Sequence, residues 1–207
     1  MSKSVVLLDF GHEESVQGKH SPDRSFFEWR FNRDLGLRIF YLLESCGVDV
    51  RIVNPETTYV SLTERANRVN RVCDEVGTSN VLLVSIHSNA AGAAGNWMNA
   101  RGWSDYVAKS CSQGAKDLAT LLTKKAEELG FKIRKPMPNQ YYWQENFTVL
   151  TKTKCKAVLT ENLFYDNRDD LRILQSEKGK QLLTLVHVNA ILEYIKINPD
   201  EIDKNNS

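Results

Sequence analysis

The residues Val5-Val6-Leu7-Leu8-Asp9-Phe10-Gly11-His12 decide the fold class of this chain. The run is almost continuously apolar, which is typical of a strand covered on both faces in a parallel sheet. A second run, Val81-Leu82-Leu83-Val84-Ser85-Ile86-His87, also ends on a histidine, and a third, Ala157-Val158-Leu159-Thr160-Glu161, ends on a carboxylate. Parallel strands align their carboxyl ends at one edge of the sheet, where open α/β folds place their sites. We therefore expect the two histidines and the glutamate to lie close together.

Segments with helical spacing of apolar residues separate these runs. Helices are predicted from Arg24 to Gly47, over 61–77, over 112–129 and over 177–196. Further strands are predicted over 48–53 and 147–150, whereas residues 90–111 are expected to form an excursion from the sheet. The alternation of strand and helix predicts an α/β fold: an open, twisted, mostly parallel sheet with helices on both faces.

The length of the chain favours one domain. It has 207 residues, and a domain typically takes about 150. We expect residues 1–197 to form a single catalytic domain and residues 198–207, which are polar, to form a tail.

Composition argues against several classes of partner. The formal net charge is +1, so no overall field attracts the chain to nucleic acid or anionic lipid. No run approaches the roughly 20 apolar residues of a membrane span. The four cysteines form no C-x-x-C pair, which argues against a zinc knuckle or a disulfide framework. We expect a monomer that binds neither nucleic acid nor membrane. Because Met1-Ser2-Lys3-Ser4 leads directly into a strand, we also expect synthesis in the cytoplasm without a signal peptide.

Glu28 is a candidate third ligand for a metal at the predicted sheet edge. It lies early in the first long helix, with Asn32 one turn further on, so both side chains point the same way. If that helix starts above the strand ends, Glu28 can meet His12 and His87. Two imidazoles and one carboxylate leave the fourth tetrahedral position of zinc for water, as in catalytic zinc sites. The plainer alternatives are a solvated helix residue for Glu28 and a polar loop residue for His12.

The order of these motifs resembles that of the zinc-dependent N-acetylmuramoyl-L-alanine amidases of the Amidase_3 type. The segments that carry the resemblance are 8–12, Glu28 with Asn32, 61–67, 85–90 and 158–164 followed by Asp166-Asn167 and Asp170-Leu171. The resemblance implies that His12, Glu28 and His87 bind Zn²⁺ and that Glu161 is the catalytic acid and base. It implies peptidoglycan as substrate, cleaved at the amide between N-acetylmuramic acid and L-alanine. Asn32 and Asn89 are expected beside the ligands, as substrate-contacting or orienting residues.

The chain departs from this family in the loop around the first histidine. The family usually has proline after the first aspartate and two glycines after the histidine, where this chain has Phe10, Glu13 and Glu14. The loss of both glycines leaves the backbone path of the loop open but not the ligand. The two glutamates are expected to add negative charge near the metal and so to affect substrate preference.

Several residues keep two interpretations at this point. Trp97, Trp103 and Trp143 are candidates for walls that stack on sugar or peptide, or for packing of long loops onto the body. His20 and His187 are expected to stay outside the site.

Two biological settings and two competing functions also remain open. A catalytic domain without a signal peptide favours a phage or prophage endolysin that acts on the cell wall after release. A bacterial amidase, cytoplasmic or exported by another route, is the alternative. The competing functions are a zinc carboxypeptidase acting on stem peptides and a non-catalytic wall-binding protein of the same fold.

Overall fold

The computed structural model describes residues 4–92 and 95–196. The chain forms one six-stranded sheet with the strand order β2-β1-β3-β6-β4-β5. The predicted α/β class, with a mostly parallel sheet and helices on both faces, is confirmed. The tail predicted at 198–207 lies outside the described residues, and the single-domain boundary at 197 stays a prediction.

Four adjacent parallel strands carry the candidate site. They are β1 (Val5–Phe10), β2 (Asp49–Ile52), β3 (Val81–Asn89) and β6 (Lys156–Phe164). The register of β1 on β3 pairs Phe10 with Ile86, and that of β3 on β6 pairs His87 with Glu161. The strands ending near His12, His87 and Glu161 are therefore neighbours in the sheet, as expected.

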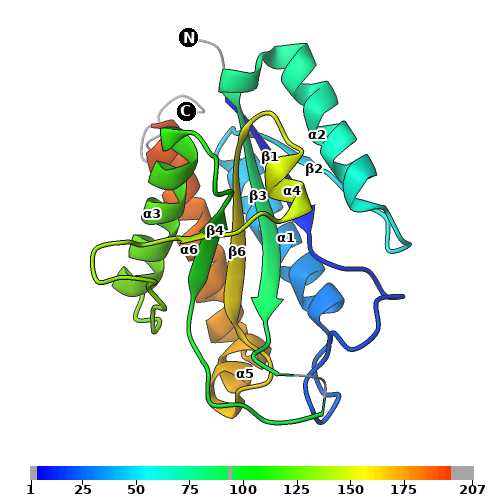
Figure 1. Ribbon diagram of the computed structural model, residues 1–207, viewed down its shortest axis with the longest axis vertical. Coiled ribbons are helices and arrows are strands. Elements are labelled where there is room, and N and C mark those ends of the chain that lie inside the picture. The colour runs from blue at the N-terminus through cyan, green and yellow to red at the C-terminus, as the bar shows by residue number, and fades with distance from the viewer. Residues whose placement is uncertain (1–3, 93–94, 197–207) are drawn as a thin grey trace.

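Helices cover the sheet in two layers. The long helices α1 (Glu28–Ser45), α3 (Gln113–Glu128) and α6 (Glu177–Ile195) pack against one another and against one face. The helix α2 (Leu62–Val76) and the single turn α4 (Thr148–Thr151) cover the other face. Figure 1 shows α1 and α6 behind the sheet and α4 in front of it. Alternate residues of β1 enter the two resulting cores, with Leu8 on one face and Leu7 on the other.

The structure corrects one prediction about the second half of the chain and adds elements that the sequence did not predict. Residues 148–151 form the helical turn α4 instead of a strand, because short apolar runs do not distinguish the two. The excursion at 90–111 contains β4 (Ser104–Val107), which runs antiparallel to β6 and pairs with β5 (Trp143–Gln144). The helix α5 (Arg168–Gln175), missed in the sequence, lies at the end of the sheet where β3 points (Figure 1). The remaining short helix is the 3₁₀ turn at Thr78–Asn80.

The start of α2 shows how local sequence fixes an element. Ser61 caps the helix by accepting a hydrogen bond from the Glu64 amide at 3.2 Å. The carboxylate of Glu64 does not complete the capping box and instead pairs with Arg68 and Arg71. This N-cap places Arg65 within the first turn of α2, where its side chain reaches the carboxyl end of β1.

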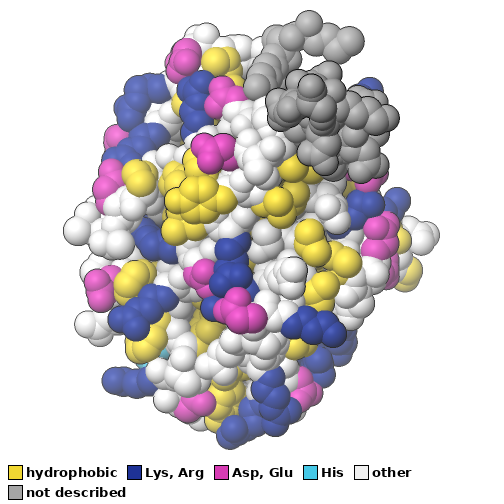
Figure 2. Space-filling view, turned by 180° about the vertical axis from the view of Figure 1, so that it is seen from behind, with side chains coloured by type: hydrophobic (Ala, Val, Ile, Leu, Met, Phe, Trp, Pro, Cys, Tyr) yellow, Lys and Arg dark blue, Asp and Glu magenta, His cyan; other side chains and the backbone are white. Residues whose placement is uncertain are grey.

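The outer surface carries both signs of charge. On the face shown in Figure 2, basic and acidic side chains are interspersed with hydrophobic ones. Among the described helices, none is both long and apolar enough to cross a membrane.

Candidate metal centre

His12 lies in the loop that leaves β1, in a conformation that few side chains adopt. Its φ is +59°, in the left-handed region. The loop is held from several sides: Asn32 Nδ2 donates to the Gly11 carbonyl at 3.0 Å, and Arg33 donates to the His12 carbonyl at 2.8 Å. These contacts stabilise the unusual backbone that projects the imidazole into the site.

Gly11 is required by the close approach of the two histidines. A Cβ atom at this position would lie 2.4 Å from the His87 ring, well inside van der Waals contact. The Gly11 amide donates to the Ile86 carbonyl at 2.9 Å, which extends the β1–β3 pairing to the site. The imidazole rings of His12 and His87 are thereby brought to 5.0 Å between centroids, at an interplanar angle of 87°.

Glu28 is the first residue of α1 and lies between the two histidines. Its side chain is buried. One carboxylate oxygen lies 3.3 Å from His87 Nδ1 and accepts a hydrogen bond from the Ser88 amide at 3.1 Å. The other oxygen lies 3.5 Å from His12 Nε2. Asn32, one turn along α1, donates to Glu28 at 3.4 Å, so the shared orientation predicted for this pair is observed.

The three side chains form a cluster with metal-binding geometry. Each offers one ligand atom, and these atoms all lie within 4.8 Å of one another. Two imidazoles and one carboxylate are a donor set suited to zinc. The pKa of Glu28 is lowered: burial opposes ionisation, but the hydrogen bond and charge of the histidines outweigh it. Burial lowers the pKa of His12 to about 4. An ionised carboxylate and a neutral imidazole are the forms in which these side chains bind metal.

Glu161 faces the cluster from β6. It is the register partner of His87 and lines the same cavity, which has a volume of about 300 Å³. One of its carboxylate oxygens is buried and has no hydrogen-bond partner within the described residues. Burial and the nearby charge of Glu28 raise its pKa to about 8, although His87 acts in the opposite direction. A carboxyl group in this state can hold and release a proton near neutral pH.

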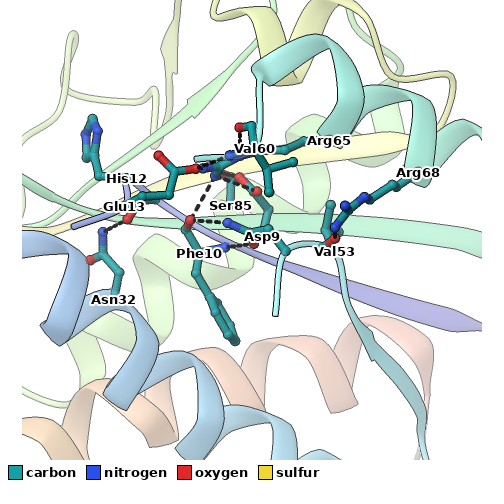
Figure 3. A network of polar contacts seen from close by, with 12 residues as sticks. Asp9, Phe10, His12, Glu13, Asn32, Val53, Val60, Arg65, Arg68 and Ser85 are labelled. Atoms are coloured by element: carbon teal, nitrogen blue, oxygen red, sulfur yellow. Dashed lines mark hydrogen bonds and ion pairs between the residues drawn. The ribbon is translucent and has the colours of Figure 1, made fainter. Parts of the chain in front are cut away.

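A buried ion-pair network supports the His12 loop from behind (Figure 3). Arg65 pairs with Asp9 at 2.9 Å and with Glu13, and it also donates to the Phe10 carbonyl at 2.8 Å. Ser85 donates to the second oxygen of Asp9 at 2.5 Å. The side chains of Asp9, Glu13 and Arg65 are each at most 3% exposed. The His12 imidazole points away from this network (Figure 3), so the network fixes the loop and not the ring itself.

The network revises the expectation for the two glutamates that replace the family's glycines. Glu13 is buried and its charge is matched by Arg65, whereas Glu14 is exposed. Glu13 therefore adds a structural contact to the loop instead of unbalanced charge at the metal cluster. The role of Arg65 was missed in the sequence, although it lies within the quoted 61–67 motif.

A second series of polar contacts supports His87. Asn162 donates to the His87 carbonyl at 2.8 Å and to Thr160 Oγ1 at 3.2 Å. Thr160 in turn contacts His187 Nε2 at 3.1 Å, and His187 Nδ1 lies 2.8 Å from the Leu183 carbonyl. His187 is fully buried in α6, so it lies outside the metal cluster, as expected, and packs in the core.

The remaining predicted residues divide between the cavity and the core. Asn89, the last residue of β3, lines the cavity and accepts a hydrogen bond from the Ala90 amide at 2.8 Å. Trp103 is fully buried and packs edge-to-face on His187, which favours the packing alternative for this residue. Trp97 and Trp143 are half-buried under the guanidinium groups of Arg168 and Arg134.

The sequence matches one known family over almost its whole length. The family is described as N-acetylmuramoyl-L-alanine amidase, Amidase_3, and the match covers residues 6–193. The chain belongs to this amidase family. All three cluster residues and Glu161 lie inside the matched range.

Individual relatives are identical to this chain at about a quarter of the aligned residues. It is 26% identical over 202 residues to an endolysin of Bacillus phage SPP1, covering 95% of this chain and 68% of that protein. It is 27% identical over 187 residues to the N-acetylmuramoyl-L-alanine amidase CwlM of Bacillus licheniformis, covering 90% and 66%. The chain thus spans about two thirds of the length of these relatives.

Solved amidase structures share the fold. An N-acetylmuramoyl-L-alanine amidase from Clostridium difficile 630 superposes with a TM-score of 0.79 at 24% identity, covering 95% of this chain and 98% of that one. The catalytic domain of CwlV from Paenibacillus polymyxa gives a TM-score of 0.77 at 23% identity, covering 94% and 99%.

Proposed function

We propose that this amidase hydrolyses the amide bond between N-acetylmuramic acid and L-alanine of peptidoglycan, with Zn²⁺ held by His12, Glu28 and His87. The observation that carries the proposal is the three-ligand cluster with a partnerless carboxylate oxygen opposite it on Glu161. Membership of the amidase family supports the choice of bond.

The residues of the site divide the chemistry between them. Bound zinc would polarise the scissile carbonyl and make a water molecule acidic enough to react near neutral pH. Glu161 accepts the proton from the attacking water and returns it to the departing alanine nitrogen. Glu28 is held by the Ser88 amide and Asn32, which keeps its carboxylate oriented between the two histidines. Asn89 is placed on the cavity wall, where its side chain can contact substrate.

We further propose that the protein acts as an endolysin, which reaches the cell wall after its release from the cytoplasm. We also propose that it works as a monomer and that peptidoglycan is its partner. The similarity to the SPP1 endolysin supports this setting.

The test combines metal analysis with analysis of digested walls. We expect one zinc per chain by emission spectrometry and none in the His12→Ala, Glu28→Ala or His87→Ala variants. Mass spectrometry of purified walls should show whole stem peptides with a free L-alanine amino end. Shortened stem peptides would instead assign a carboxypeptidase, and wall binding without release of peptides at full zinc occupancy would assign a non-catalytic protein.

A further inference from the structure

Lys19 is a charged residue of the metal-site cavity that the proposed chemistry does not use. It lies in the loop between β1 and α1, and its carbonyl accepts a hydrogen bond from the Glu28 amide at 2.9 Å. The next residue, His20, forms an antiparallel bridge with Phe27. These contacts fix the Lys19 backbone beside the first residue of α1. The side chain is half-buried and lines the same cavity as Glu28 and Glu161.

The Lys19 ammonium group has no carboxylate partner among the described residues, although it is half-buried beside the metal cluster. Arg65, Arg68 and Lys180, by contrast, each pair with two carboxylates. The charge of Lys19 nevertheless reaches the site: it contributes to the lowered pKa of Glu28 and opposes the larger effect of burial, which raises the pKa of Glu161. A half-buried cation that no protein group neutralises is suited to bind an anion of a ligand.

The charge balance of the loaded site points the same way. A divalent metal offsets the two carboxylates Glu28 and Glu161. Lys19 then leaves the cavity with a surplus of positive charge, and in a partly enclosed site this favours an anionic group on the substrate.

The chemistry of the substrate shows which anion can be close to the scissile bond. The carboxyl group of N-acetylmuramic acid is consumed in the amide, so the sugar side of the bond is neutral. The peptide side is different: after L-alanine comes a D-glutamyl residue joined through its γ-carboxyl, whose α-carboxyl is either free or amidated according to the wall.

We infer that Lys19 binds the free α-carboxylate of the stem-peptide residue that follows L-alanine and makes this enzyme prefer non-amidated stem peptides. The inference rests on the proposed amidase function and adds a determinant of specificity to it. Glu13, by contrast, is buried against Arg65 and offers the substrate no charge.

The kinetic test compares two substrates that differ only in this group: N-acetylmuramoyl-L-alanyl-γ-D-glutamyl-L-lysine, in which the γ-carboxyl is joined to the next residue, and the same compound with the α-carboxyl amidated. For the zinc-loaded wild type we expect kcat/KM to favour the carboxylate by about tenfold, the size of one charge-assisted contact. Lys19→Met should bring the ratio near one, and Lys19→Arg should keep most of the preference. Lys178→Met, at an exposed lysine of α6, is the matched control and should keep the wild-type ratio.

A binding measurement separates this inference from the proposed function. The product tripeptides, L-alanyl-γ-D-glutamyl-L-lysine and its α-amidated form, cannot be cleaved at the scissile bond, so calorimetry reports their affinity directly. We expect the Lys19→Met substitution, with zinc content unchanged, to weaken only the carboxylate form, by about tenfold. Equal losses for both forms, or no loss for either, would overturn the inference while leaving the amidase function intact. A wild type that cleaves neither muramoyl peptide and releases no stem peptides from walls would overturn both.

Discussion

The carboxylates of β1 and the loop that follows it differ in their surroundings from those of the paired strands β4 and β6. Asp9 and Glu13 are both paired with the Arg65 guanidinium behind the His12 loop. Glu161 and Asp105 have no ion-pair partner among the described residues, and their pKa values are raised by burial to about 8 and about 7. Asp9 and Glu13 form ion pairs that shape a loop, whereas burial raises the pKa of Glu161 and Asp105 into the range where a carboxyl group can gain and lose a proton. Support for a metal ligand and proton transfer thus require different surroundings for the same functional group.

The largest effect is expected from removing the proton-transfer carboxylate. Glu161→Gln keeps the size of the side chain but cannot accept a proton, so wall hydrolysis should fall by about 10²- to 10⁴-fold. Zinc content should stay at the wild-type level, because Glu161 is not among the clustered ligands. The measurement is release of soluble peptides from purified walls, with the exposed Glu145→Gln as control. Undiminished activity with zinc bound would remove Glu161 from the mechanism.

The next effect tests the other side of the comparison. Arg65→Met leaves Asp9 and Glu13 buried without their cation, which should lower the free energy of unfolding by about 3–5 kcal/mol. Arg71→Met removes an exposed pair with Glu64 and should cost less than about 1 kcal/mol. Denaturant titration of both variants gives the comparison. Equal stability of the two would show that the network behind the His12 loop contributes little.

The comparison also explains what could be predicted from the sequence. The sheet edge that carries the site was predictable because β1, β3 and β6 have nearly continuous apolar runs. A histidine or a glutamate that can bind metal or transfer a proton comes at or just after the end of each run. The convergence of His12 with His87 and Glu161 follows from parallel pairing alone. Glu28 was a candidate only on the condition that its helix starts above the strand ends, because its position depends on where α1 begins, and the family resemblance supported that choice.

The sequence was less informative where tertiary contacts decide the outcome. The position of Glu13 in a loop beside a metal ligand predicts an exposed carboxylate. Only the fold shows that Arg65, 52 positions further along the chain, lies next to it. Likewise β4 and β5 have only four and two residues, so their sequences show little periodicity. The pairing of β4 with β6 holds them in the sheet. The prediction of a strand in place of the helical turn α4 was wrong for a related reason: four apolar or β-branched residues are compatible with a strand or with a helical turn.

A smaller effect should come from Asp105, the second carboxyl group whose pKa is raised by burial. Its folded pKa of about 7 lies above the ordinary aspartate pKa of 3.8. Between these values the folded chain keeps a proton that the unfolded chain has lost, so the stability falls as pH rises through this window. Asp105→Asn cannot titrate, so from about pH 5 to about pH 6.5 the wild type should lose about 2 kcal/mol relative to this variant.

Thermal or denaturant unfolding across that pH range checks the slope. In the Asp105→Asn variant, the amide oxygen of the new side chain can still accept the hydrogen bond that Trp103 Nε1 donates at 2.9 Å in the wild type. The exposed Asp117→Asn variant is the control and should follow the wild-type curve. Parallel curves for the wild type and Asp105→Asn would mean that Asp105 is ionised in the fold.

The finest test of the comparison is the replacement of Glu13 by glycine, the residue that the family usually has there. Glu13→Gly removes the carboxylate that pairs with Arg65 and accepts from the Val60 amide at 3.3 Å. The His12 loop keeps its contacts to Asn32, Arg33 and Asn54. We therefore expect zinc affinity, measured by chelator competition, to fall by about tenfold and not to vanish. Glu14→Gly, at the adjacent exposed position, should leave it unchanged. A lower melting temperature with unaltered zinc affinity would confine Glu13 to stability, and the ligand loop would then owe its geometry to the amide and guanidinium contacts alone.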